Sequence, residues 1–170
     1  MSENVVRLVV GLGNPGVEYL ATRHNVGFWF VDALAAELGA AFRATRRLHG
    51  ESARATLGKA ELLLLKPDTF VNRSGLAVRA TLDYFKYEPS QLLVAHDDLD
   101  LAPGTVRVKR GGGHGGHNGL RDIIAHVGAD FARLRFGIRH PAAGAAVIDY
   151  VLGAPPRAEE EEILTALGAA

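Results

Sequence analysis

Apolar residues along the chain follow two patterns, short runs and longer segments in which they recur every three to four residues. The short runs are bounded by turn-forming residues and are typical of strands, whereas the recurring pattern is typical of helices. The expected strands are residues 5–10, 49–57, 60–65, 92–95, 105–109 and 134–138. The expected helices are residues 26–38, 76–85, 120–127 and 159–167.

Two helix ends can be predicted as well. Gly39 follows the last apolar position of the first helix, where a glycine commonly ends the helix. Asn118 precedes the third helix and is a suitable N-cap. Residues 147–152 form one further short apolar segment, and the pattern assigns no element type to it.

Strands and helices alternate along the whole chain, and no change in composition marks a linker. We therefore expect a single α/β domain over residues 1–170, with a mixed, largely parallel β-sheet flanked by helices and a short C-terminal helix. Binding sites in such sheets lie beyond the carboxyl ends of the strands. The polar residues that follow three of the expected strands are Asn14, Asn72 and Asp97.

The composition narrows the class of protein. The 170 residues are 48% hydrophobic and include no cysteine. A chain of this size can bury a sizeable core, and the lack of cysteine excludes a disulfide framework and thiol catalysis. No apolar run approaches the length of a membrane span, so we expect a soluble cytoplasmic protein.

The formal net charge is zero, but the charges are unevenly distributed. Residues 104–141 contain seven lysines and arginines against two aspartates, and residues 43–59 contain five against Glu51 alone. A polyanion responds to such local patches rather than to the sum. Solvated surface charge is the alternative explanation of either group.

Residues 11–16 match the dinucleotide fingerprint G-x-G-x-x-G. That fingerprint needs a helix directly after the turn and then a second strand. Here residues 17–23 have no helical period, and the next regular segment is the helix at 26–38. Pro15 also removes one backbone donor from the turn. A dinucleotide site is therefore the weaker alternative.

Residues 111–119 form a loop in which six of the nine residues are glycine. So many glycines are costly to order, which favours a loop whose backbone closely approaches a ligand and whose amides face an anion. A flexible linker is the alternative. His114 and His117 have the spacing of a metal pair, to which Asp97 or Asp98 can be added, but no third ligand is fixed by spacing. We therefore expect no metal.

His24 lies between the first expected strand and the first expected helix, and imidazole titrates near neutral pH. A carboxylate that accepts a hydrogen bond from one imidazole nitrogen leaves the other nitrogen free to take a proton from water. We expect Asp97 to be this carboxylate, because both residues lie in loops at one edge of the sheet. Asp98 or Asp100 can replace it in the argument, and a structural hydrogen bond is the alternative role of His24.

Asparagines at breaks in the pattern are further candidates, because an amide offers both a donor and an acceptor to a peptide-like group or an oxyanion. These residues are Asn14, Asn72 and Asn118. Turn formation or capping is their alternative role. Tyr19 and Phe70 are aromatic neighbours of these groups, unless they are ordinary core residues.

Together these residues resemble the bacterial-type peptidyl-tRNA hydrolases from Arg7 to about Pro156. The resemblance rests on the order and spacing of GLGNPGVEYLATRHNVGFWFVD, LLLKPDTFVNRSG, LLVAHDDLDLAPGTVRVKRGGGHGGHNGLRDII, RLRFGIRHP and YVLGAPP. It implies a single α/β domain with a twisted mixed sheet. It also implies hydrolysis of the ester that joins a peptide to the 3′ end of tRNA, without a cofactor. We expect a monomer.

The resemblance assigns a role to each matching residue. His24 matches the base that activates water, Asp97 the residue that orients it, and Asn14 the asparagine beside it. The residues that match the peptide- and nucleotide-binding cleft are Tyr19, Phe70, Asn72, His117 and Asn118. The residues that match the tRNA-binding basic patch are Lys109, Arg110 and Arg135.

The chain also departs from the family. Val71 stands where relatives commonly have methionine, which alters the wall of the pocket. The given sequence stops at Ala170, early in a C-terminal helix that contributes tRNA contacts in relatives, so the resemblance does not determine the tRNA affinity. A non-catalytic RNA-binding relative is the second hypothesis, against which the retention of His24 and Asp97 argues.

Overall fold

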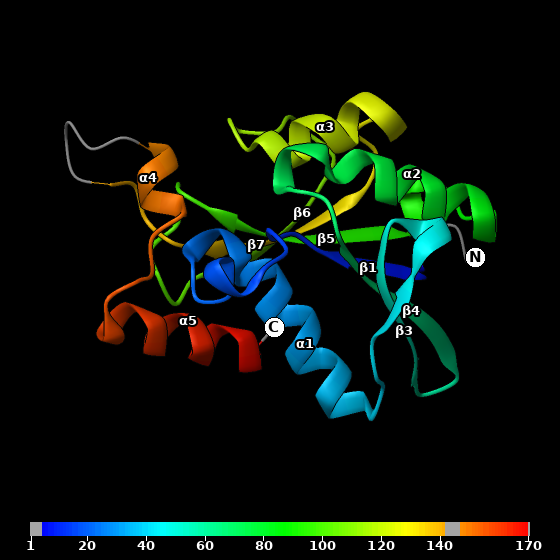
Figure 1. Cartoon of the computed structure of the whole chain (residues 1–170), viewed down its shortest axis with the longest axis horizontal. Coiled ribbons are helices and arrows are strands. Elements are labelled where there is room, and N and C mark those ends of the chain that lie inside the picture. The colour runs from blue at the N-terminus through cyan, green and yellow to red at the C-terminus, as the bar shows by residue number, and fades with distance from the viewer. Residues whose placement is uncertain (1–4, 142–146, 170) are drawn as a thin grey trace.

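The computed structural model describes residues 5–141 and 147–169 (Figure 1). Within these residues one seven-stranded sheet has the strand order β2-β3-β4-β1-β5-β7-β6. Its strands are β1 (Leu8–Gly11), β2 (Arg43–Thr45), β3 (Gly50–Leu57), β4 (Ala60–Pro67), β5 (Leu92–Asp98), β6 (Val106–Arg110) and β7 (Ala132–Gly137). The α-helices are α1 (Val26–Leu38), α2 (Ser74–Phe85), α3 (Asn118–Val127), α4 (Val147–Val151) and α5 (Arg157–Ala169). The short 3-10 helices are η1 (Val17–Tyr19), η2 (Arg23–Asn25), η3 (Arg46–Leu48), η4 (Val71–Arg73) and η5 (Pro89–Gln91).

The central strands are buried on both faces, which explains why they read as continuous apolar runs rather than alternating ones. β1 pairs in parallel with β4 and β5, and β5 pairs in parallel with β7. β3 and β6 are antiparallel to their neighbours β4 and β7. Helices α1 and α5 pack on one face and α2 and α3 on the other (Figure 1). The expected mixed, largely parallel α/β fold is confirmed.

Helix α1 lies unusually close to the centre of the sheet. A Cβ atom on Gly11 would lie 2.3 Å from the carbonyl oxygen of Gly27, and one on Gly27 would lie 2.4 Å from that of Ala95. Both positions therefore require glycine, and the contact brings η2 onto the carboxyl ends of β1 and β5. Since η1 and η2 intervene before α1 begins at Val26, the fingerprint glycines serve packing and do not open a phosphate-binding helix.

Local sequence signals predicted both ends of helix α1 but not the N-cap of α3. Helix α1 has the predicted bounds, and Gly39 ends it in the left-handed conformation with φ 69°. The predicted N-cap of α3 is wrong. His117, not Asn118, caps this helix, and its side chain accepts hydrogen bonds from the amides of Gly119 and Leu120.

Two strands and one helix differ from the sequence pattern. β5 continues through Asp98, so Asp97 lies on the strand and not in the loop after it. β2 was not expected, because its three residues at the sheet edge are not buried and carry no apolar pattern. The short apolar segment that begins at Val147 forms helix α4. No helix in the described part of the chain has the length and apolar character needed to cross a membrane.

Candidate active site

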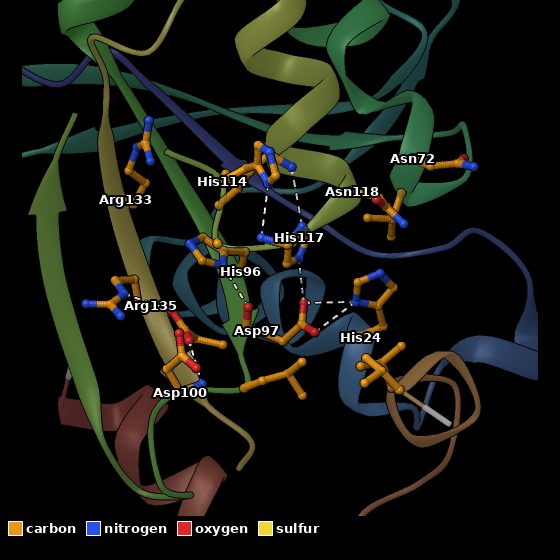
Figure 2. Close-up of a pocket in the computed structure, with 18 of the residues that line it drawn as sticks. His24, Asn72, His96, Asp97, Asp100, His114, His117, Asn118, Arg133 and Arg135 are labelled. Carbon is orange, nitrogen blue, oxygen red and sulfur yellow. Dashed lines mark hydrogen bonds and ion pairs between the residues drawn. The ribbon is translucent and has the colours of Figure 1, made fainter. Parts of the chain in front are cut away.

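A cavity of about 570 Å³ opens at the carboxyl ends of β1 and β5 and is bordered by α3 and α4 (Figure 2). Three titratable side chains from distant parts of the chain meet on its wall. His24 comes from η2, Asp97 from β5 and His117 from the residue that caps α3. The Asp97 side chain is 3% exposed, so its charge is almost removed from solvent.

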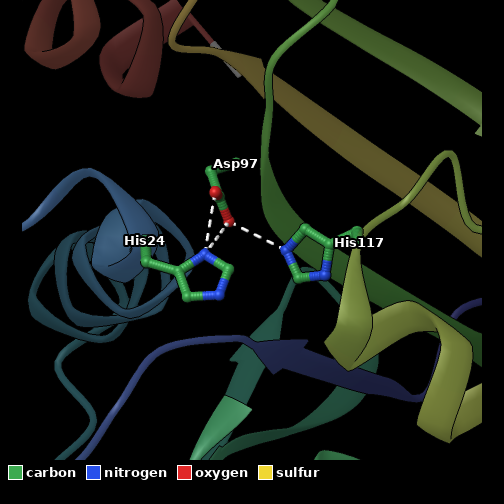
Figure 3. Close-up of side chains that lie close together, drawn as sticks. All are labelled: His24, Asp97 and His117. Carbon is green, nitrogen blue, oxygen red and sulfur yellow. Dashed lines mark hydrogen bonds and ion pairs between the residues drawn. The ribbon is translucent and has the colours of Figure 1, made fainter. Parts of the chain in front are cut away.

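The two imidazoles contact the same carboxylate (Figure 3). Nδ1 of His24 lies 2.8 Å from Oδ2 of Asp97 and 3.0 Å from Oδ1. Nε2 of His117 lies 2.9 Å from Oδ1 of Asp97. The predicted contact between His24 and Asp97, which lie 73 residues apart, is therefore confirmed.

The hydrogen bonds fix which nitrogen of each imidazole carries the proton. Nδ1 of His117 accepts from the backbone amides of Gly119 and Leu120, at 3.1 and 3.3 Å, so the N–H that donates to Asp97 is on Nε2. An ionised carboxylate only accepts, so His24 donates to it from Nδ1. Nε2 of His24 then remains as a proton acceptor, and it points away from Asp97 (Figure 3).

The surroundings shift the pKa values of this pair in opposite directions. Burial lowers the pKa of His24, but the charge of Asp97 and the hydrogen bond to it outweigh burial, so the pKa lies above the ordinary 6.5. Burial raises the pKa of Asp97, but His24 and His117 outweigh it and hold the pKa well below its usual range. Asp97 is therefore ionised at neutral pH and stabilises a proton on His24, which is the electrostatic arrangement that a general base needs.

The alternative carboxylates have other partners. Oδ2 of Asp98 lies 2.8 Å from Nε of Arg135, and Oδ1 of Asp100 lies 2.7 Å from Nε2 of His140. Asp98 and Asp100 line the same cavity, but these partners hold their carboxylates. Neither carboxylate replaces Asp97 beside His24.

Asn14 lies at the base of the cavity, 6% exposed, and is held on both its backbone and its side chain. Asn25 accepts from the backbone amide of Asn14 at 2.9 Å and donates to its carbonyl oxygen at 3.0 Å. Oδ1 of Asn14 accepts from the amide of Val71 at 2.7 Å. Because its side-chain oxygen is engaged, Asn14 presents its NH2 group as the available donor.

The other predicted cleft residues lie around the same cavity. Asn72 and Asn118 are exposed on its rim, on η4 and at the start of α3 (Figure 2). The rings of Tyr19 and Phe70 pack edge to face with centroids 5.9 Å apart. Phe70 is 53% exposed, so it is not an ordinary core residue and offers an apolar surface at the entrance.

The glycine loop is tied to the sheet by Arg133, which is only 2% exposed. Its guanidinium donates to the carbonyl oxygens of Gly113 at 2.8 Å, Gly112 at 3.1 Å and Ala129 at 3.0 Å. It also lies 4.1 Å from the ring centre of Phe131. A buried arginine that bonds three carbonyl oxygens gives the loop a fixed path, which the linker interpretation does not explain.

His96 is a second buried imidazole beneath this loop, 3% exposed. Its Nδ1 lies 2.7 Å from the carbonyl oxygen of Asp97, and its ring packs edge to face on His117. Burial and the neighbouring His117 lower its pKa to about 4, against the weaker opposing effects of Asp97 and Asp98. His96 is therefore neutral at physiological pH and donates to the backbone of Asp97, which helps to hold that residue in place.

The predicted basic residues divide between the two faces of β6. Lys109 lies opposite Arg133 in the register of β6 and β7, and both line the cavity together with Arg135. Arg110 is the next residue along β6, so it projects from the other face and donates to the carbonyl oxygen of Ser90 at 3.3 Å. Arg135 is partly neutralised by Asp98, whereas Lys109 is exposed.

Asp97 and the two histidines bonded to it form the group of side chains that could hold a metal ion among the described residues. Among the described residues, His24, Asp97 and His117 have ligand atoms that all lie within 4.8 Å of one another. His114, the other half of the expected metal pair, is outside this set, and its Nδ1 accepts from the amide of Gly116. In the observed arrangement both histidines are hydrogen-bonded to Asp97, and an ion would have to replace these bonds.

Sequence reasoning missed one wall of the cavity and its buried arginine. Val147, Val151 and Leu152 line the side opposite α3, and the apolar pattern of this segment was the only signal for it. Arg133 stands two positions before Arg135, so strand alternation places both on one face. That spacing is the signal that could have identified it.

The chain is similar to known proteins both in its sequence and in its three-dimensional structure. The sequence model of the family described as peptidyl-tRNA hydrolase matches residues 8–170. A peptidyl-tRNA hydrolase of Marinobacter nauticus (strain ATCC 700491 / DSM 11845 / VT8) is 54% identical over 164 residues, which are 96% of this chain and 83% of that protein.

Solved structures match equally well. The crystal structure of peptidyl-tRNA hydrolase from Acinetobacter baumannii superposes with a TM-score of 0.94 at 46% identity, over 98% of this chain and 84% of the other. A peptidyl-tRNA hydrolase in complex with N-propanol superposes with a TM-score of 0.93 at 46% identity, over 96% of this chain and 83% of the other.

Proposed function

The chain belongs to the peptidyl-tRNA hydrolase family and hydrolyses peptidyl-tRNA, and we propose that it does so with a water molecule activated by His24. The observation that supports this role is the buried, ionised Asp97 bonded to Nδ1 of His24, which leaves Nε2 as a base at the cavity wall. A positioned base of this kind typically contributes a rate factor of about 10² to 10⁴.

In the proposed reaction, Nε2 of His24 takes a proton from water as its oxygen attacks the carbonyl carbon of the ester. A tetrahedral intermediate forms, with a negative charge on the former carbonyl oxygen. The bond to the ribose oxygen of the tRNA then breaks, and the proton on His24 passes to that oxygen. The products are a peptide with a free carboxyl group and a tRNA with a free hydroxyl group.

We assign the asparagines to the reacting groups by their available donors. The NH2 group of Asn14 can donate to the developing oxyanion, because its own oxygen is held by the amide of Val71. Asn72 and Asn118 on the rim can hold the peptide or the attacking water. Tyr19 and Phe70 offer the apolar surface against which the terminal nucleotide or the peptide packs.

We place the tRNA on the side of the cavity that carries Lys109 and Arg135, with Arg110 as a flanking contact. The rationale for the two cavity-lining cations is their position on one face of β6 and β7 at the cavity edge. We further propose that the protein acts as a monomer, since one chain supplies every group named in the reaction. We also propose that it acts in the cytoplasm.

The test of the proposed function is the pH dependence of peptide release in a single-turnover assay with peptidyl-tRNA. The base must be neutral, and the pKa of His24 is raised above 6.5, so kcat/KM is expected to fall as the pH decreases through a value above 6.5. A rate that stays level down to pH 6.5 would exclude His24 as the base. The same assay with aminoacyl-tRNA tests whether the peptide is required.

Replacing Lys109 by alanine should raise KM for peptidyl-tRNA several-fold with little change in kcat. The side chain is exposed at the cavity edge and contributes one phosphate contact in the proposed complex. The slope of log(kcat/KM) against log[salt] should decrease by about 1. Lys59→Ala, in the exposed turn between β3 and β4, is the matched control and should change neither quantity. An unchanged KM with a lower kcat would assign Lys109 to a different role.

A further inference from the structure

Arg23, the residue directly before His24, is a buried arginine without an acidic partner in the described part of the chain. It is 8% exposed. Its Nη1 donates to the carbonyl oxygen of Tyr150 at 2.9 Å and to that of Gly153 at 3.3 Å. Its guanidinium carbon lies 3.9 Å from the ring centre of Tyr150. The backbone amide of Arg23 also donates to Gly153, at 3.0 Å.

Burying this guanidinium is costly, since a charge loses its hydration and no carboxylate of residues 5–141 or 147–169 pairs with it to compensate for the loss. The carbonyl oxygens and the face of the Tyr150 ring replace water around it. Nε nevertheless has no hydrogen-bond partner among the described residues. A planar group that stacks on a ring while its edge bonds two carbonyls is specific to arginine, because lysine offers only a point charge.

The two elements joined by this contact form neighbouring parts of the cavity wall. Residue 23 begins η2, which carries His24, whereas Tyr150 lies in α4 and Gly153 follows the end of that helix at Val151. From the same segment, Val147, Val151 and Leu152 line the cavity. Arg23 is therefore the side chain that ties the apolar wall to the turn that bears the proposed base.

The wall segment has a second attachment on its other side. The hydroxyl of Tyr150 donates to the carbonyl oxygen of Ile138 at 2.5 Å, and Ile138 is the residue directly after β7. Tyr150 thus stands between the sheet and Arg23, and its ring fixes the distance between them. Loss of the guanidinium would leave α4 attached to the sheet, and attached to η2 only through the backbone hydrogen bond from Arg23 to Gly153.

We propose that Arg23 is a positioning residue that sets the distance between the α4 wall and His24, and through it the fit of the substrate beside the ester. This inference rests on the proposed role of His24. The pKa shift of His24 arises from burial and from Asp97, and that of Asp97 from burial, His24 and His117, so the guanidinium is not among their causes. Loss of the contact should therefore weaken substrate binding and leave the base itself unchanged.

The test is steady-state hydrolysis of peptidyl-tRNA by Arg23→Lys, with KM and kcat measured across pH. We expect KM to rise about tenfold, the equivalent of one hydrogen bond to a charged group. kcat should stay nearly constant, and the pH at which kcat/KM falls should be that of the wild type. Tyr150→Leu removes the ring from the same contact and also the hydrogen bond to Ile138, so it should raise KM at least as much.

Arg79→Lys is the matched control. Arg79 also donates to a carbonyl oxygen, that of His126 at 2.7 Å, but it lies on the outer face of α2 and not on the cavity. Its substitution should leave KM unchanged. The double variant Arg23→Lys/Tyr150→Leu should be no worse than Tyr150→Leu alone, because that substitution already breaks the stacking contact of Arg23.

Two results would overturn the inference. A lower melting temperature with an unchanged KM in both variants would make Arg23 structural only, and a fall in kcat with a shifted pH profile would show that it acts through His24. If Arg23→Lys does not fold, the KM, kcat, melting temperature and pH profile of Tyr150→Leu are judged by the same criteria. A failure of the proposed role of His24 would give a different result. His24→Ala would then hydrolyse peptidyl-tRNA at the wild-type rate, whatever the KM of the Arg23 and Tyr150 variants.

Discussion

Replacing His24 by alanine is expected to lower kcat for peptidyl-tRNA hydrolysis by about 10² to 10⁴-fold. The variant loses the only proposed acceptor for the proton of the attacking water, and also the group that returns this proton to the ribose oxygen. Binding of tRNA should change little, because the proposed phosphate contacts lie on β6 and β7. Single-turnover peptide release and equilibrium binding of tRNA measure the two effects separately.

The matched control is His126→Ala. His126 also lies near an aspartate, with Nδ1 3.7 Å from the carboxylate of Asp122, but it is on α3 and 37% exposed outside the cavity. Its removal should leave kcat at the wild-type value. The residual rate of His24→Ala should also lose the decline at acidic pH that the imidazole causes. Wild-type turnover in His24→Ala would remove this residue from the mechanism.

The site could be located from sequence because its parts follow strands that are recognisable locally. The apolar runs of β1 and β5 predicted a sheet with polar residues at its carboxyl edge, and Gly11 and Ala95 are in fact paired in parallel register. That register is the reason that His24 and Asp97 meet. Sequence could place both residues at one edge and favour Asp97, but its own pattern left Asp98 and Asp100 as alternatives, because the choice depends on where β5 ends.

The parts that sequence did not reveal all depend on long-range contacts. His117 was expected only to line the cleft, yet it caps α3 with one nitrogen and donates to Asp97 with the other. Arg133 reaches back some 20 residues to hold the glycine loop, and Arg23 reaches 127 residues forward to Tyr150. Charged residues usually indicate surface, so burial of these arginines has no local signal.

The histidine pair gives Asp97 a function that an uncharged isostere cannot reproduce. Both imidazoles donate to it, His24 from Nδ1 and His117 from Nε2, and the proton on Nε2 of His117 is fixed by the amides that bond its Nδ1. A carboxylate accepts both hydrogen bonds with its two oxygens. An asparagine has one oxygen, so its NH2 group would face one of the two N–H groups.

Asp97→Asn should therefore lower kcat by about 10² to 10⁴-fold with little effect on tRNA binding, because His24 is driven to the tautomer with its proton on Nε2. The loss of the negative charge should also lower the pKa of His24, so that the remaining activity declines at a more acidic pH than in the wild type. The pH profile of single-turnover hydrolysis measures both effects.

A double variant separates the tautomer effect from the loss of charge. In Asp97→Asn/His117→Ala the second N–H donor is gone, so the amide oxygen is free to accept from Nδ1 of His24 and restore its basic nitrogen. Part of the activity lost in Asp97→Asn should then return, although each substitution alone removes a polar contact. If the double variant is instead as slow as the product of the two single effects, the charge of Asp97 matters and the competition between the imidazoles does not.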